Sequence, residues 1–264
     1  MDRFENDVLK YNNKNGIEYI QFKKLLEMGI NNAYTLKGEN IQFRTNSEHE
    51  QESIEKIFGA LELDVNTRVK PLQKHTSNIR CINKVMRSEE LQSIDGLLTD
   101  QKGITLCTTN ADCNLILFYD PVKKVIGNIH SGWRGTFQKI AERAVDKMIN
   151  YYRCNPEDIY VFFSPSIRKC HFEVDIPVKE LCESIFKYTG RLEEFIEKGR
   201  LLEDGTQKYN IDTTMINKIM LTEKGIKEEN IYDSGLCSVC HSDKINSFRA
   251  DGKNYQLSTL IISM

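Results

Sequence analysis

The chain has 264 residues, 28% of them charged, and a formal net charge of −2 at pH 7. This balance excludes the basic surface of nucleic-acid-binding and polybasic membrane-surface proteins. No apolar run approaches the ~20 residues of a membrane span, and the N-terminal Met1-Asp2-Arg3-Phe4 does not read as a signal peptide. We therefore expect a cytoplasmic protein with one domain over residues 1–264, large enough to bury roughly three quarters of its unfolded surface.

Short strands and two helices are expected in the first 61 residues, with helices at 21–28 and 47–61. Beyond residue 90 strands and helices follow without strict alternation. Helices are expected at 135–152, 178–188 and 211–221, strands within 91–130 and at 161–163, 232–233 and 258–262, and a charged connection at 193–202. In the helix at 178–188, Leu181 is expected to face inward. This order of elements favours an α/β or α+β fold with a mixed central β-sheet.

The segment around Cys113 and His130 predicts a β-hairpin. Two apolar, strand-like runs at 114–119 and 125–129 flank Asp120-Pro121-Val122-Lys123, a sequence typical of a type I turn. A two-residue turn, our prediction, would place Cys113 directly opposite His130, with Cβ atoms about 4.5–5.5 Å apart. A four-residue loop would make them diagonal neighbours, and a three-residue loop would put them on opposite faces.

A thiolate and two imidazoles form a zinc ligand set with one open position, which is typical of catalytic zinc. Cys113 and His130 are the pair that the hairpin favours, and His75 is the candidate third ligand, although a histidine after Gln73 also suits an exposed surface. Gly132 and Gly135 follow His130 and allow close approach of other atoms. The first residues after His130 should therefore border the site.

Several motifs resemble those of the YfiH-like family, whose members carry the labels laccase-domain protein, polyphenol oxidase and purine nucleoside phosphorylase. The similar motifs are Gln73-Lys-His75, Asp95-Gly-Leu-Leu-Thr99-Asp100, Thr109-Asn-Ala-Asp-Cys113, His130-Ser-Gly-Trp-Arg-Gly135, Ser164-Pro-Ser-Ile167 with Cys170, and Cys237-Ser-Val-Cys240 with Ser247-Phe-Arg-Ala-Asp-Gly252. The resemblance runs from about residue 70 to 264. It implies a layered α/β/α fold with a mixed central β-sheet.

The resemblance also implies a function. His75, Cys113 and His130 would bind Zn²⁺ and carry catalysis. The reactions would be phosphorolysis of adenosine, inosine, guanosine or methylthioadenosine to base plus sugar 1-phosphate, and hydrolytic deamination of adenosine. The expected partners are small-molecule purine nucleosides and phosphate, with neither nucleic acid nor membrane, and a homodimer is kept open.

Other residues are assigned supporting roles. Arg134 offers a planar cationic fork and, with Arg249, is our candidate for phosphate binding. Trp133 is a candidate purine-stacking surface and Ser166 a candidate substrate contact. Three further candidates are expected to support the ligands or donate a proton, namely Asp95, Thr99 and Asp112.

Departures from the family and rival functions stay open. The family's second arginine after Arg249 is Ala250, and Asn254-Tyr255-Gln256 replaces its terminal Thr-Gly-Arg. A copper-dependent (Cu²⁺) polyphenol oxidase is one alternative, although the chain has only five histidines. A Cys–His hydrolase or amidase without metal is another, because an opposed thiolate and imidazolium form an activated nucleophile. A non-enzymatic role is a weaker alternative.

Eight cysteines call for an interpretation. Cys237-x-x-Cys240 has the spacing of metal ligands, but no second pair matches it, so the sequence argues against a structural zinc site there. Cys170 is expected either to line the active site or to pack. The remaining thiols outside the hairpin are expected to be ordinary buried cysteines: Cys81, Cys107, Cys154 and Cys182.

Overall fold

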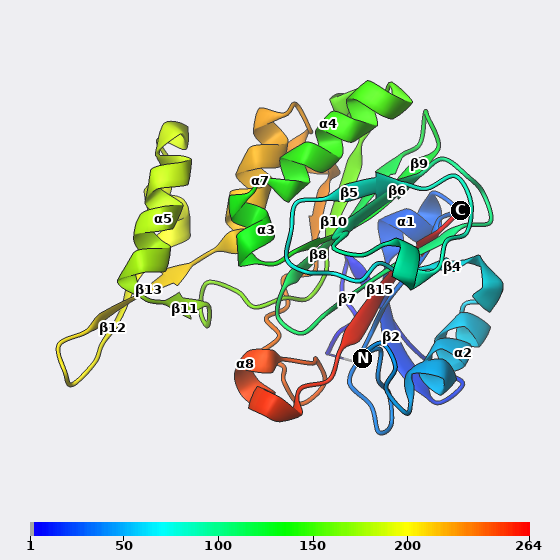
Figure 1. Cartoon of the computed structure of the whole chain (residues 1–264), viewed down its shortest axis with the longest axis horizontal. Helices are drawn as coiled ribbons and strands as arrows, with labels where there is room; N and C mark the ends of the chain where they lie inside the picture. Colours follow the sequence, from blue (N-terminus) through cyan, green and yellow to red (C-terminus); the bar gives the residue numbers. More distant parts are fainter. Residues whose placement is uncertain (1–2) are drawn as a thin grey trace.

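Two six-stranded β-sheets lie face to face at the centre of the molecule (Figure 1). The computed structural model describes residues 3–264. In spatial order, the first sheet contains β1 (Leu9–Lys14), β2 (Ile17–Phe22), β3 (Asn31–Thr35), β15 (Ser258–Ser263), β7 (Thr105–Asn110) and β4 (Arg68–Val69). The second contains β14 (Ile231–Asp233), β10 (Tyr160–Phe163), β8 (Asn114–Asp120), β9 (Val125–Ser131), β6 (Gly96–Thr99) and β5 (Ile79–Cys81).

Both sheets are mixed. Neighbouring strands are antiparallel except for β4 beside β7, β10 beside β14 and β5 beside β6. The central strands are apolar on both faces because each sheet is covered on both sides. In β8, Leu115 and Leu117 pack between the sheets, whereas Ile116 and Phe118 pack under the helices of the outer face. This double burial explains why residues 114–119 form a continuous apolar run.

Helices cover the two outer faces. The longest, α4 (Ile140–Tyr152), packs with α7 (Thr213–Glu223) on the second sheet, and α2 (Glu50–Ala60) packs on the first (Figure 1). Each helix turns an apolar stripe inward, as in α4, where Ile140, Ala144 and Met148 are fully buried. The short helices are α1 (Lys23–Glu27), α3 (Trp133–Phe137), α6 (Leu192–Phe195) and α8 (Phe248–Asp251).

A third, three-stranded sheet stands to one side of this body. It consists of β11 (Glu173–Val174), β13 (Gln207–Ile211) and β12 (Ile196–Leu201), and it lies beside α5 (Ile176–Phe186) (Figure 1). The predicted connection at 193–202 is therefore wrong, because these residues form α6 and β12. Leu181 of α5 is also exposed (46%) rather than inward.

The predicted α/β class is confirmed, and the layers are more numerous than expected. Where the sequence predicts one mixed central sheet, the chain builds two mixed sheets, so the order of layers is helix, sheet, sheet, helix. The predicted helix at 135–152 is two helices, because Lys139 adopts a left-handed backbone conformation (φ 61°) between α3 and α4. Across residues 3–264, no helix has the length and apolar character needed to cross a bilayer.

Candidate metal centre and active site

The β8–β9 hairpin has a four-residue loop. Asp120 pairs with Val125 and Leu115 pairs with His130. The predicted two-residue turn is therefore wrong, and Cys113 and His130 are the diagonal neighbours of the alternative register. The loop is longer because Asp120 accepts hydrogen bonds from the backbone N–H groups of Val122 and Lys123, an Asx turn that places Pro121 outside the ladder.

Three side chains converge just beyond the ends of this hairpin. One ligand-type atom from each of His75, Cys113 and His130 lies within 4.8 Å of the others. The Sγ of Cys113 is 3.8 Å from Nε2 of His75, and the two imidazole rings are 4.8 Å apart between centroids. The structure therefore brings together the three residues named from the sequence, one thiol and two imidazoles.

Asp95 positions both histidines. Its fully buried carboxylate lies 2.8 Å from Nδ1 of His130, which leaves Nε2 of that ring free to face Cys113. The same carboxylate accepts hydrogen bonds from the backbone N–H groups of Lys74, His75 and Thr76. One side chain therefore sets the ring of His130 and the backbone from which His75 projects.

The backbone of His75 is in the left-handed region (φ 58°), which few residue types adopt without strain. The loop before it is held by Gln73, whose side-chain amide exchanges hydrogen bonds with the N–H and C=O of Thr109 on β7. Gly132 closes the site from the other side. A Cβ atom there would lie 2.6 Å from His75 Cδ2 and 3.0 Å from Cys113 Sγ, so a larger residue would have to displace the His75 ring.

The electrostatics favour a charged pair of Cys113 and His130. Burial opposes ionisation of Cys113, but His130 and His75 outweigh it and lower the pKa of the thiol to about 6. Burial also opposes protonation of His130, but Cys113 and Asp95 raise the pKa of its imidazole to about 9. Hydrogen bonds from His130 and Thr76 overcome the burial of Asp95 and lower the pKa of its carboxyl to about 2.

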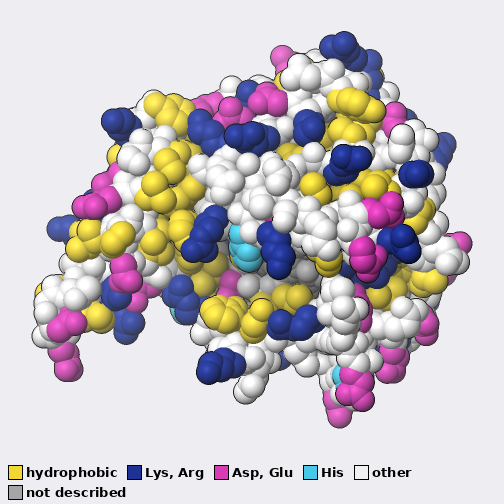
Figure 2. Space-filling model, viewed as in Figure 1, with side chains coloured by type: hydrophobic (Ala, Val, Ile, Leu, Met, Phe, Trp, Pro, Cys, Tyr) yellow, Lys and Arg dark blue, Asp and Glu magenta, His cyan; other side chains and the backbone are white. Residues whose placement is uncertain are grey.

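The three residues border a cavity of about 790 Å³, large enough for a nucleoside-sized ligand. Aromatic residues in its wall are Trp133, Phe172, Phe248 and Tyr255, and cationic residues are Arg44, Lys70, Lys74 and Arg249. Figure 2 shows histidine surface in a hollow with basic side chains on both sides of it. Lys70 is already neutralised by Glu50 at 2.9 Å, so the other three cations are the ones available to an anionic ligand.

The two arginines predicted to bind phosphate differ in position. Arg249 lines the cavity, and its Nη1 and Nη2 atoms donate to the backbone carbonyls of His171 and Glu173. Arg134 is exposed, lies outside the cavity-lining residues and stacks on Trp133, with 4.2 Å from Cζ to the ring centroid. Trp133 itself lines the cavity and makes a T-shaped ring contact with Phe137.

Three other predicted residues serve the fold around the site. Ser166 is fully buried, donates to Asn114 and does not line the cavity. Thr99 is also fully buried, donates to the carbonyl of Ile82 and does not line the cavity. Asp112 lines the cavity, but both its oxygens accept hydrogen bonds, from Ser238, Ser247 and the N–H of Arg249, so it ties loops together.

Sequence reasoning missed two asparagines that shape the site. Asn110 donates to the carbonyls of Cys113 and Pro165 and so closes the turn that presents the thiol. Asn114 accepts from Thr214 and donates to Thr213, which docks α7 behind the hairpin. The sequence carried a signal for Asn114, a polar residue at the start of the apolar strand β8, whereas Asn110 ends a strand that also contains three threonines.

The structure also brings a second set of ligand-type side chains together. Cys170 and His171 lie beside Cys237 and Cys240, with one ligand atom from each within 4.8 Å of the others. The sequence has no second pair with the spacing of Cys237-x-x-Cys240, but the structure places two other ligand-type residues beside this motif. The missing pair is two adjacent residues, a spacing that the search for a second Cys-x-x-Cys did not cover.

Comparison with known proteins identifies the family. The family described as multi-copper polyphenol oxidoreductase laccase matches residues 29–263. The chain belongs to this family. A solved member of the same fold, the YfiH protein of Bacillus licheniformis, superposes with a TM-score of 0.87 at 22% identity, covering 98% of this chain and 100% of that one.

Curated relatives carry enzyme names. The mouse purine nucleoside phosphorylase LACC1 is 32% identical over 218 residues, which are 81% of this chain and 47% of that protein. Adenosine deaminase RL5, from an unknown prokaryotic organism, is 28% identical over 201 residues, 74% of each chain. The laccase-family chain described here thus spans about half the length of the first relatives it matches.

Proposed function

We propose that this chain is a zinc-dependent purine nucleoside enzyme, which cleaves purine nucleosides with phosphate and hydrolytically deaminates adenosine. The observation that carries the proposal is the convergence of His75, Cys113 and His130 on the wall of a cavity with aromatic and cationic side chains. The names of the mouse LACC1 and RL5 relatives support the same substrate class.

The donor set fits zinc. A tetrahedral zinc ion with Zn–S about 2.3 Å and Zn–N about 2.0–2.1 Å separates S and N ligands by about 3.6 Å. The observed distance from Cys113 Sγ to His75 Nε2 is 3.8 Å. One thiolate and two imidazoles leave a fourth position for water or substrate. Zinc bound there would supply Lewis acidity and lower the pKa of water toward neutrality.

The chain's own residues would orient these ligands and the substrate. Asp95 holds His130 in the tautomer with Nε2 free, and it fixes the backbone of His75. Asp95 and Asp112 accept hydrogen bonds at both carboxylate oxygens, so we assign them positioning roles rather than proton donation.

The cavity wall fits a purine nucleoside and an anion. Trp133 and Phe172 belong to the cavity wall and are our candidates for stacking of the base. In phosphorolysis a phosphate oxygen bonds to C1′ of the sugar, the bond from C1′ to the purine breaks, and the base leaves after taking up a proton. Arg249 is our first candidate to hold the phosphate, because it lines the cavity, and Arg134 would act from the rim.

The test is a chromatographic time course of adenosine with purified, metal-analysed protein, with and without phosphate. Adenine that forms only with phosphate establishes phosphorolysis, and inosine that forms without phosphate establishes deamination. Inosine, guanosine and methylthioadenosine then define the nucleoside preference. If zinc-loaded protein forms neither adenine nor inosine, the proposal is refuted.

A metal-free Cys–His hydrolase is the second candidate, favoured by the depressed pKa of Cys113 beside the raised pKa of His130. The third ligand discriminates between the two. Under the zinc proposal His75→Ala loses metal and turnover together. Under the hydrolase alternative, His75→Ala protein keeps its hydrolytic activity without metal, because Cys113 and His130 are both still present.

The copper-oxidase alternative fits this chain less well. His75 and His130 belong to the candidate centre, and His171 to the second cluster. With five histidines in the whole sequence, only two remain for further copper ions. Oxidation of a phenol by the copper-loaded protein at a rate above that of the Cys113→Ala variant would support this alternative instead.

A further inference from the structure

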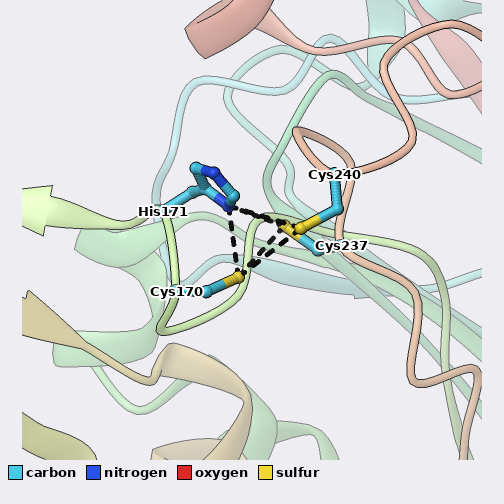
Figure 3. Close-up of side chains that lie close together, drawn as sticks. All are labelled: Cys170, His171, Cys237 and Cys240. Carbon is cyan, nitrogen blue, oxygen red and sulfur yellow. Dashed lines mark hydrogen bonds between the residues drawn. The ribbon is translucent and has the colours of Figure 1, made fainter.

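The second cluster of cysteines and histidine lies outside the candidate active site. None of its four members is among the residues that line the cavity. Figure 3 shows the three sulfur atoms and Nδ1 of His171 turned toward one point. Cys170 and Cys240 are exposed and Cys237 is buried, so the cluster lies at the surface with one side embedded in the protein.

The distances within the cluster match tetrahedral zinc. Sγ of Cys170 is 3.6 Å from Sγ of Cys237 and 3.9 Å from Sγ of Cys240. Nδ1 of His171 is 3.2, 3.6 and 3.5 Å from the sulfur atoms of Cys170, Cys237 and Cys240. A zinc ion with ordinary bond lengths requires about 3.8 Å between two sulfur ligands and about 3.6 Å between sulfur and nitrogen.

The fold preorganises the two segments. Cys170 follows β10 and Cys237 follows β14, and these strands are parallel neighbours, so their loops leave the same edge of the sheet. Ser166 continues the pairing beyond the strands, since its N–H donates to Leu236 and its carbonyl accepts from the N–H of Ser238. Backbone hydrogen bonds therefore tie together the two loops that carry the cysteines.

We propose that Cys170, His171, Cys237 and Cys240 bind a second zinc ion, with a structural role. Three thiolates and one imidazole fill all four tetrahedral positions and leave none for a substrate, which is typical of structural zinc. Sulfur-rich ligation also selects zinc over magnesium, calcium or manganese.

The site's neighbours indicate what it stabilises. Phe172 follows His171 directly and lines the cavity, and Arg249 donates to the carbonyl of His171. Asp112, next to Cys113, accepts from Ser238 inside the Cys-x-x-Cys loop. A zinc ion here would thus clamp two loops that carry one wall of the cavity and a neighbour of the active-site thiol.

The test is the zinc content of protein purified under reducing, chelator-free conditions, measured in four variants. We expect two zinc ions per chain in the wild type and one in Cys240→Ser. The same loss is expected in Cys113→Ala, and the Cys113→Ala/Cys240→Ser double variant should hold none. Cys81→Ser removes a thiol that lies outside both clusters, so this variant should keep both ions.

Three outcomes would overturn the proposal. One is wild-type zinc content in Cys240→Ser, another is a Cys113→Ala protein without any zinc, and the third is a disulfide within the cluster in anaerobically purified protein. Full zinc content in Cys113→Ala would instead refute the active-site triad, so the two proposals fail separately.

A spectroscopic measurement tests the cluster with all four of its ligand side chains in place. Cobalt-loaded Cys113→Ala protein should show intense thiolate-to-cobalt charge-transfer absorption, because three thiolates surround the remaining site. Absence of this absorption from folded, cobalt-treated Cys113→Ala protein would also overturn the proposal. A lower Tm of Cys240→Ser relative to Cys81→Ser would be the expected sign of the structural role.

Discussion

Replacing Asp95 by asparagine should weaken zinc binding and destabilise the fold together. One carboxylate oxygen accepts from Nδ1 of His130 at 2.8 Å and from the N–H of His75 at 3.0 Å. The other accepts from the N–H and hydroxyl of Thr76 and from the N–H of Lys74. In either orientation the new amide NH₂ would face at least two donors, so at least two hydrogen bonds are lost.

The expected magnitude follows from these bonds. Each hydrogen bond to a charged group contributes about 1.5–3 kcal/mol, so the free energy of unfolding should fall by about 3–6 kcal/mol. Loss of a residue that orients a metal ligand typically weakens metal affinity about 10–100-fold. We expect the zinc affinity of Asp95→Asn to fall by a factor in this range. The reason is that His130 loses the partner that fixes its tautomer and His75 loses the partner of its backbone N–H.

The assay is a competition titration with a chromophoric zinc chelator, accompanied by urea unfolding. Asp120→Asn is the matched control, because Asp120 is equally buried but holds the loop at the other end of the hairpin. That variant should keep wild-type zinc affinity. Wild-type affinity in folded Asp95→Asn protein would refute the role assigned to Asp95.

Three further predictions concern single positions. Gly132→Ala should lower turnover about 100-fold, since its Cβ would displace His75 and Cys113; unchanged turnover would contradict the close approach. In zinc-free protein the alkylation rate of Cys113, followed by mass spectrometry of its peptide, should rise with pH through about 6, because the thiolate forms above its pKa. A midpoint near the ordinary value of 9.0 would contradict this. Arg249→Ala should raise the KM for phosphate about tenfold, because one charge-assisted hydrogen bond to phosphate is lost. Arg134→Ala should raise this KM by a smaller factor. If Arg249→Ala lowers deamination as much as phosphorolysis, Arg249 has a structural role.

Local patterns predicted much of the fold around the site. The apolar runs of β8 and β9, the turn residues between them and the helical spacing after residue 135 all correspond to elements of the structure. The register was harder to predict, because Asp120 accepts from two N–H groups and lengthens the loop to four residues. A choice between turn types depends on such side-chain contacts, which spacing does not reveal.

Long-range features were beyond the sequence. The pairing of Cys170 with Cys237 depends on β10 and β14 lying side by side, and the two cysteines are 67 residues apart. The split into two sheets has a similar cause, because strands that are buried on both faces read alike whether a helix or another sheet covers them. The cavity cation Arg44 likewise comes from a loop that none of the motifs described above includes.

The most direct test of the zinc centre is a paired measurement of zinc content and adenosine turnover in Cys113→Ala, with Cys81→Ser as the control. We expect Cys113→Ala to contain one zinc ion fewer per chain than the wild type and to form neither adenine nor inosine. Cys81→Ser should keep the wild-type zinc content and form both products. Wild-type turnover by Cys113→Ala, or wild-type zinc content in that variant, would contradict the assignment of His75, Cys113 and His130 as the catalytic metal site.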